Sequence, residues 1–472
     1  MSEQSKKIPC CTGLLAHVDA GKTTLSEGLL YVSGARRTLG RVDHRDAFLD
    51  TNAQERERGI TIFSKQAMLS TADLDVTLVD TPGHVDFSAE TERTLSILDC
   101  AILVISGTDG VQAHTLTLWN LLEKYGVPTF LFINKMDLPG TDREKLLEGL
   151  RKQLSPNCLD FGLSAEEIQE NAAMCDEALL ETYLQTGTVT AGNIRGLIAG
   201  RKIFPCCFGA ALKLEGVEDL LEIINTYAPR NTYPAGFGAK VYKITRDPQG
   251  ARLTWLKITG GSLSVREALT YLPLQGENIT EKVLQIRLYS GEKFTAAESV
   301  AAGSLCAVTG LSATYAGQGL GSEPCAAPPT LEPVMTYRVC FPVDPATVLP
   351  KLRQLEEEDP LLHLLWDSNT RQIFVQIMGR VQLEVFRNLV KERFNLDITL
   401  DDPRIFYKET IENAVEGVGH FEPLRHYAEV HLLLEPLPRG SGKSLRSGAG
   451  RFKCKKKTCA MAAPPPHAYQ AT

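Results

Sequence analysis

The sequence lacks any apolar run of the roughly 18 residues that a membrane-spanning helix requires. Its N-terminus is polar through Lys7, so the apolar core of a signal peptide is also missing. Cysteines spaced as metal ligands are absent too, because the pairs at residues 10–11 and 206–207 are adjacent in the chain. These absences predict a cytoplasmic protein without a transmembrane segment, whose cysteines are free thiols buried on strands.

Acidic residues are missing from the end of the chain. Residues 436–472 hold eight Lys or Arg and no Asp or Glu, although the whole chain has a formal net charge of −7. We interpret residues 441–472 as a basic low-complexity tail that is disordered or read out of frame. The alternative is that its lysines, at 453 and 455–457, contact RNA phosphates. Residues 440–444 resemble a phosphate-binding loop, but too little chain follows them to build a nucleotide-binding domain.

The chain of 472 residues is too long for one core and should divide into several domains. Residues 1–232 alternate β-branched runs with helical patterns, which predicts an α/β domain with a doubly wound, mostly parallel sheet. The expected strands are residues 8–15, 76–80, 101–106, 129–134 and 203–208. The expected helices are residues 23–33, 87–98, 114–125, 142–154, 165–185 and 217–227. Such sheets bind ligands at the carboxyl ends of their strands.

The later part of the chain changes pattern twice. Residues 233–330 have a period of two, which predicts a β-barrel domain. Residues 331–402 read as βαββαβ, the order of a ferredoxin-like α+β domain. Residues 403–440 read as the start of an incomplete fourth domain, with its clearest strand at residues 428–434.

Residues 16–23 read as a phosphate-binding loop between the first strand and the first helix. Backbone N–H groups at a helix N-terminus surround phosphates, where the helix dipole favours an anion. Lys22 adds a positive charge near the β- and γ-phosphates, and Thr23 offers a hydroxyl to Mg²⁺. The expected nucleotide contacts are His17, Val18, Asp19, Ala20, Gly21, Lys22, Thr23 and Thr24.

Two further segments suggest a switch that responds to the γ-phosphate. Thr61, in residues 58–62, can reach Mg²⁺ and the γ-phosphate only while that phosphate is present. Asp80 ends a strand and can hold Mg²⁺ through water, and Gly83 offers an N–H to the γ-phosphate. His84 can orient the attacking water. The competing interpretations are that Thr61 only opens a strand and that His84 is a surface residue.

A guanine base is predicted from residues 134–137. The Asp137 carboxylate can accept from the ring N–H and the exocyclic amine of guanine, a pattern that adenine cannot offer. The stem of Lys135 would pack over the base, and Asn134 ends the strand that carries the motif. A backbone N–H of the loop at 209–212 would close over the base edge. The expected contacts in that loop are Ala210, Ala211 and Leu212.

In this order, the five segments resemble a translational GTPase of the elongation factor G superfamily. The amino-acid sequence of residues 16–33, 80–86 and 417–432 more closely resembles the tetracycline ribosomal-protection branch of that superfamily. The resemblance spans about residues 8–440. It implies a ribosome-stimulated enzyme that hydrolyses GTP to GDP and phosphate with Mg²⁺. The implied catalytic residues are Lys22, Thr61, Gly83 and His84, and the implied metal ligands are Thr23, Thr61 and Asp80.

The resemblance also implies a partner, the ribosome, through the ribosomal RNA and proteins at its factor-binding site. We expect a monomer with neither a membrane nor DNA as partner. Hydrolysis would drive release from the ribosome or its remodelling, in tetracycline protection or a related elongation-factor-G-like role. Two departures stand out: Ala210 replaces the usual Ser, and the resemblance ends near residue 440, within the fourth domain. The alternatives are therefore a GTP-gated ribosome-binding module and a truncated remnant that lacks the remodelling activity.

Overall fold

The computed structural model describes residues 7–40, 48–49, 53–405, 411–421 and 428–438. The chain divides into two compact units, Met1–Arg404 and Ile405–Thr472. In the described residues, no helix has both the length and the apolar character needed to cross a membrane. The predicted basic tail, residues 441–472, lies outside the described residues.

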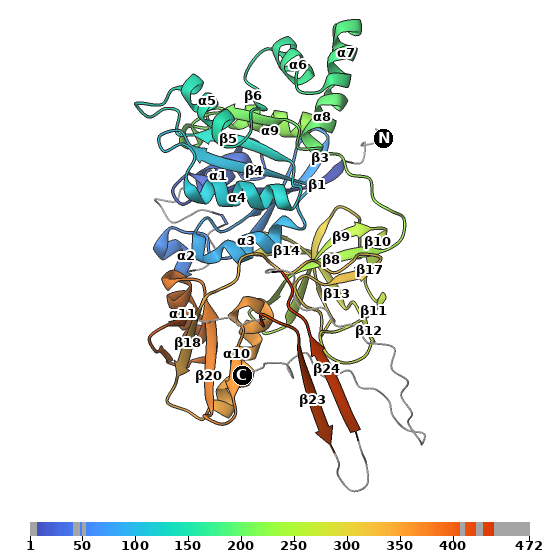
Figure 1. Ribbon diagram of the computed structural model, residues 1–472. Coiled ribbons are helices and arrows are strands. Elements are labelled where there is room, and N and C mark those ends of the chain that lie inside the picture. The colour runs from blue at the N-terminus through green and yellow to red at the C-terminus, as the bar shows by residue number, and fades with distance from the viewer. Residues whose placement is uncertain (1–6, 41–47, 50–52, 406–410, 422–427, 439–472) are drawn as a thin grey trace. The chain divides into compact units, whose positions relative to one another are not determined.

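The first unit begins with a seven-stranded sheet in the order β2-β3-β1-β4-β5-β7-β6. Figure 1 labels β1, β3, β4, β5 and β6 of this sheet, with helices beside them. All neighbouring pairs are parallel except β2 with β3. The five predicted strands are present. The sequence did not reveal the two edge strands, because β6 has only three residues and β2 is half polar. The strands are β1 (Ile8–Ala16), β2 (Lys65–Ser70), β3 (Leu74–Asp80), β4 (Cys100–Ser106), β5 (Thr129–Asn134), β6 (Cys158–Asp160) and β7 (Phe204–Phe208).

Helices cover both faces of this sheet. One apolar cluster joins the strands to α1, α6, α7, α8 and α9, and another joins them to α3, α4 and α5. The predicted helix at 165–185 is wrong as a single element: Asp176 accepts from the Leu179 N–H and starts a new helix. The helices are α1 (Lys22–Val32), α2 (Ala53–Arg58), α3 (Ser88–Leu95), α4 (Ala113–Lys124), α5 (Arg143–Gln153), α6 (Ala165–Ala173), α7 (Glu177–Thr186), α8 (Ala191–Ala199) and α9 (Val217–Tyr227).

A β-rich domain follows, in agreement with the predicted barrel. Its six-stranded antiparallel sheet has the order β14-β13-β16-β9-β8-β17, and two small sheets, β10-β15 and β11-β12, share its apolar core. The strands are β8 (Gly238–Arg246), β9 (Arg252–Gly260), β10 (Ser262–Ser264), β11 (Ala268–Tyr271), β12 (Ile279–Lys282), β13 (Gln285–Ser290), β14 (Lys293–Ala297), β15 (Ser299–Ala301), β16 (Leu305–Thr309) and β17 (Gly319–Gly321).

The next domain has the predicted βαββαβ order, with sheet order β19-β20-β18-β21. Its helices α10 and α11 pack on the sheet through one apolar cluster. The elements are β18 (Met335–Cys340), α10 (Pro345–Glu358), β19 (Leu365–Asp367), β20 (Gln372–Ile377), α11 (Arg380–Phe394) and β21 (Thr399–Leu400), with β22 (Arg404–Ile405) at the division between the units. In the second unit, β23 (Val415–Phe421) pairs antiparallel with β24 (Ala428–Leu434), the strand predicted there.

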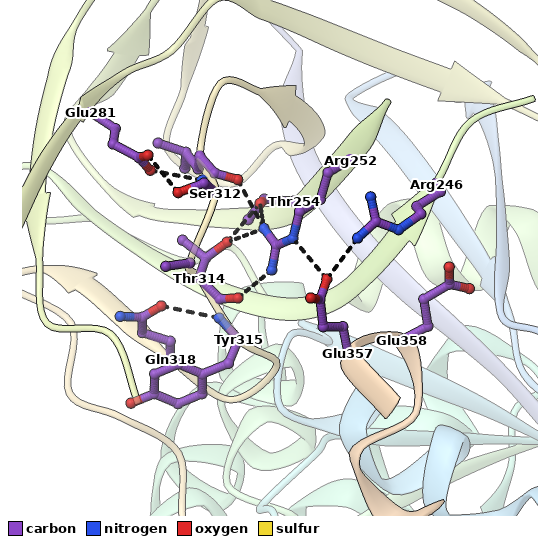
Figure 2. A network of polar contacts seen from close by, with 12 residues as sticks. Arg246, Arg252, Thr254, Glu281, Ser312, Thr314, Tyr315, Gln318, Glu357 and Glu358 are labelled. Atoms are coloured by element: carbon purple, nitrogen blue, oxygen red, sulfur yellow. Dashed lines mark hydrogen bonds and ion pairs between the residues drawn. The ribbon is translucent and has the colours of Figure 1, made fainter. Parts of the chain in front are cut away.

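A polar network ties the α+β domain to the β-barrel (Figure 2). Glu357, near the end of α10, accepts from Arg246 at 3.0 Å and from Arg252 at 3.3 Å. The guanidinium of Arg252 also donates to the Leu311 carbonyl and the Thr314 hydroxyl, both at 2.9 Å. Since Arg252 is satisfied on every side, its position is fixed, and it holds α10 against strands β8 and β9.

The described cysteines are all free, as predicted. Seven of them are buried, on β1, β4, β6, β7 and β16. Cys175, Cys325 and Cys340 are not buried, so the prediction of burial is wrong for these three.

Candidate functional site

The loop between β1 and α1 has the geometry of an anion-binding nest. Asp19 and Gly21 have positive φ angles, 64° and 90°. Left-handed residues therefore alternate with right-handed ones along this loop, and successive N–H groups point into one concavity. A Cβ at position 21 would lie 2.2 Å from the Asn134 amide nitrogen, so only glycine fits there. One nitrogen of His17, Nδ1, is buried without a hydrogen-bond partner, and burial lowers the pKa of this ring.

Lys22, Thr61 and Asp80 converge beside this loop. The Lys22 ammonium forms an ion pair with Asp80 and donates to the Thr61 hydroxyl at 3.0 Å. The Thr61 hydroxyl lies 3.4 Å from the other carboxylate oxygen of Asp80. All three side chains are buried, with at most 7% exposed. Residues from three separate segments therefore meet at the carboxyl edge of the sheet.

The donors at this edge fit a magnesium ion. Asp80 and Thr61 offer a carboxylate and a hydroxyl, and Thr23 lies next to Lys22 in the first turn of α1. Mg²⁺ takes oxygen ligands and usually one or two carboxylates together with substrate phosphates. Across the described ranges, no three His, Cys, Asp or Glu side chains gather in a metal-type cluster. A metal at this edge would therefore depend on hydroxyl and phosphate oxygens as well as on Asp80.

Glu55 fixes the segment that carries Thr61, and the sequence did not point to it. The charged stretch up to residue 58, which is absent from the predicted helices, contains helix α2. The fully buried Glu55 carboxylate accepts from the Ile62 N–H at 3.0 Å and the Phe63 N–H at 3.1 Å, and it pairs with Lys65. These bonds fold residues 60–63 back toward α2, and they set the direction in which Thr61 points.

His84 follows β3 and precedes the short 3-10 helix η2 (Val85–Phe87). Position 83 lies against the phosphate loop, because its ideal Cβ would be 3.1 Å from the Ala16 carbonyl oxygen. Nδ1 of His84 accepts from the Asp86 N–H at 3.1 Å, so the neutral ring carries its proton on Nε2. His84 is 28% exposed. The Nε2–H is therefore the group left to bind a water molecule.

Asn134 joins the phosphate loop to the loop at 209–212. Its amide donates to the Ala20 carbonyl at 2.9 Å and accepts from the Ala211 N–H at 2.9 Å. The Ala211 N–H is thus already engaged, and it can reach a base only if Asn134 shares or releases it. Ala210 needs no hydroxyl to keep this loop closed, because its N–H and carbonyl both bond to the Glu215 backbone.

Asp137 lies near this loop with its side chain 17% exposed. It pairs with Lys213 at 3.1 Å, a contact that the sequence did not predict. Lys135, two residues earlier, has a left-handed backbone with φ 64°. Leu212 is 55% exposed on the 3-10 helix η3 (Ala211–Lys213). The predicted base contacts therefore come from two loops that one amide and one ion pair hold together.

Glu90, on α3, links the end of the Thr61 segment to the β-barrel. It accepts from Ser64, pairs with Arg93 at 2.7 Å and lies 3.7 Å from Lys243 of β8. Burial alone would raise the pKa of this carboxyl, but the two cations and the Ser64 hydroxyl hold it at about 2. No sequence pattern marks this junction, since Ser64 and Lys243 are far from Glu90 in the chain.

Acid should weaken this junction. Glu90 has a lowered pKa in the folded state, so its stabilisation is complete above about pH 4.5, the ordinary value, and is lost as the pH falls toward about 2. We expect the free energy of unfolding, measured in urea at pH 5 and at pH 3, to fall less for Glu90→Gln than for the wild type. Glu181→Gln, on an exposed part of α7, should keep the wild-type dependence. Equal pH dependence in Glu90→Gln and the wild type would contradict the assignment.

The sequence matches two known families at the domains described above. Residues 9–230 match the family described as "Elongation factor Tu GTP binding domain". Residues 341–402 match "Elongation Factor G, domain III". The first match contains every predicted site residue, and the second contains α10 and α11.

Relatives match over most of the chain. "Elongation factor G 2" of Syntrophus aciditrophicus (strain SB) is 30% identical over 91% of this chain and 75% of its own length. "Tetracycline resistance protein TetM" of Ureaplasma urealyticum is 32% identical over 92% of this chain and 71% of its own length. A crystal structure of a Thermus thermophilus protein superposes with a TM-score of 0.74 at 24% identity, covering 91% of this chain and 73% of that one. The chain therefore belongs to the elongation factor G family of translational GTPases, and it is a GTP-hydrolysing enzyme that binds guanine nucleotides.

Proposed function

We propose that this protein is a ribosome-dependent GTPase in which GTP hydrolysis drives its release from the ribosome or remodels it. The relatives named above include an elongation factor G and a tetracycline resistance protein, so the role is one of these two kinds. We propose that three domains carry out this function, at residues 1–232, 233–330 and 331–402. One observation carries the proposal: Lys22, Thr61 and Asp80 meet at the sheet edge where the His84 segment lies against the phosphate loop.

The proposed roles follow from the chemistry of phosphoryl transfer. Lys22 and the loop N–H groups would hold the β- and γ-phosphates, and Thr23, Thr61 and Asp80 would hold Mg²⁺, which neutralises phosphate charge. Lys22 contacts Asp80 and Thr61 directly. A bound γ-phosphate therefore has to attract the Lys22 ammonium away from these two residues, and the Thr61 segment then contacts the phosphate in place of Lys22. His84 would then orient the attacking water through its Nε2–H.

Removing either switch side chain should slow hydrolysis without weakening binding of GDP. His84→Ala loses the group that orients water, and a misplaced reactant costs about 10²-fold in rate. Thr61→Ala loses the hydroxyl that senses the γ-phosphate, and it should lower turnover by a similar factor. The measurement is single-turnover GTP hydrolysis with saturating ribosomes, with GDP affinity measured separately.

The matched control is Thr182→Ala, which removes an exposed hydroxyl on α7 far from the switch segments in sequence. It should hydrolyse GTP at the wild-type rate. If His84→Ala and Thr61→Ala do so as well, the assignment of the switch is wrong.

The alternative is a GTP-gated module that binds ribosomes without remodelling them. This alternative predicts that the protein co-sediments with ribosomes in the presence of a non-hydrolysable GTP analogue, but that it does not protect them from tetracycline. Expression in a tetracycline-sensitive host separates the two roles. A raised minimum inhibitory concentration that is lost in His84→Ala supports protection, whereas an unchanged one favours the module or an elongation-factor-like role.

A further inference from the structure

Asp86 connects the His84 segment to the N-terminus of α11, a helix that is distant along the chain. One carboxylate oxygen of Asp86 accepts from the Val381 N–H at 2.8 Å and from the Gln382 N–H at 3.3 Å. The other oxygen lies 3.5 Å from Nδ1 of His84, and the Asp86 N–H donates to that same nitrogen. A single residue thus caps a helix of the α+β domain and holds the imidazole.

The approach of α11 to Asp86 is unusually close. An ideal Cβ on Gly379, the residue before α11, would lie 2.2 Å from a carboxylate oxygen of Asp86. Any side chain at position 379 would therefore displace the Asp86 carboxylate. Gly379 has an extended backbone, so this requirement comes from space alone and not from backbone strain.

Other contacts hold α11 at the same switch segments. Ile62, Phe87 and Val385 form one buried apolar cluster, which joins the Thr61 segment, the His84 segment and α11. On the rim, Arg58 pairs with Glu384 at 2.8 Å. The α11 helix therefore packs against both switch segments, and Asp86 is the point at which its N-terminus reaches the His84 loop.

We propose that Asp86 is a positioning residue for hydrolysis, which takes its place from the N-terminus of α11 and thereby fixes the imidazole of His84. The inference rests on the proposed role of His84 as the residue that orients water. Free N–H groups and the dipole at a helix N-terminus favour a carboxylate, so a docked α11 holds Asp86 in one position. With Asp86 held, its N–H fixes Nδ1 of His84, and Nε2–H remains the donor for water. The α+β domain thus controls the geometry of the reaction from outside the nucleotide-binding domain.

The experiment perturbs Asp86 from both sides in the full chain. Gly379→Ala displaces the carboxylate by steric clash, and Asp86→Ala removes it. Either change should lower kcat for ribosome-stimulated GTP hydrolysis by about 10-fold, which is less than the roughly 10²-fold cost of a misplaced reactant because the imidazole of His84 is still present. The KM for GTP and the affinity for GDP should stay within about two-fold. Asp86→Asn keeps a side-chain oxygen that caps helices as well as Asp does, so it should restore most of kcat.

The matched control is Gly196→Ala on α8, where the added Cβ meets no atom within 4 Å. It should behave as the wild type in both kinetic constants, and its unfolding temperature should not fall, because Ala favours a helix more than Gly does. A wild-type kcat in folded Gly379→Ala and Asp86→Ala, when His84→Ala is slow, would overturn the inference and leave the role of His84 intact. A wild-type kcat in His84→Ala would instead refute the proposed function. If Gly379→Ala does not fold, the kcat of Asp86→Ala compared with that of Asp86→Asn still tests the inference. An equal loss of kcat in both variants overturns the helix-capping argument.

Discussion

Replacing Asp137 by Asn is expected to turn the nucleotide preference from guanine to xanthine. A carboxylate accepts two hydrogen bonds from the ring N–H and the amine of guanine, whereas an amide accepts one and donates one. Xanthine carries a carbonyl in place of that amine, so it matches Asn and not Asp. A site built on such bonds rejects the mismatched base strongly, and we expect the ratio of GTP to XTP affinity to fall by about 10⁴-fold. Direct titration of the wild type and the variant with fluorescent GDP and with fluorescent XDP measures both affinities.

The control for this change is Asp142→Asn, because Asp142 caps α5 by accepting from the Glu144 and Lys145 N–H groups. It should leave the base preference unchanged. A second effect of Asp137→Asn is the loss of the ion pair with Lys213, which lies 3.1 Å away. Lys213→Met removes the same pair and keeps the carboxylate, so it should still prefer guanine. An unchanged preference for GTP in Asp137→Asn would show that this carboxylate does not read the base.

Local patterns in the sequence were enough to predict the strands and loops that carry the site. The runs that end at Asp80 and Asn134 are apolar and β-branched, and short polar motifs follow them directly. Parallel strands bring their carboxyl ends to one edge, so these motifs had to lie near the phosphate loop. The meeting of Lys22 and Asp80 follows from that topology, whereas Thr61 is brought to them by the bonds of Glu55 to the Ile62 and Phe63 N–H groups.

The residues that fix the site could not be predicted in this way. Asp86 bonds to the N–H of Val381, which is 295 positions away, and no periodicity marks a partner at that distance. Glu55 stands in a charged run that reads as solvent-exposed, yet its carboxylate is fully buried. In both cases a backbone N–H is the donor, and backbone groups carry no signature in the sequence. The interruption between α6 and α7 did have a local signal, because Asp176 is a residue type that caps helices. The helical pattern on both sides of Asp176 outweighed that signal.

Lys257→Met is expected to destabilise the protein strongly, at the junction between the nucleotide-binding domain and the β-barrel. Lys257, on β9, donates to Asp99 at 2.7 Å and to the Gly303 carbonyl at 2.9 Å, and it is only 3% exposed. Asp99 also accepts from the Cys11 N–H and from the Asn231 side chain, each at 2.7 Å. Removing the cation leaves a carboxylate buried without its counter-charge, which costs about 3–5 kcal/mol.

The reason for so large a loss is the uncompensated charge, and a second substitution tests that reason. Asp99→Asn together with Lys257→Met removes both charges and keeps a side-chain oxygen for the Cys11 N–H, so it should recover most of the lost free energy. Lys391→Met breaks an ion pair with Asp397 whose partners are both well exposed, and it should cost far less. Urea unfolding followed by tryptophan fluorescence measures all three, since Trp255 lies two residues from Lys257. If the double variant is as unstable as Lys257→Met alone, the loss comes from packing and not from the buried charge.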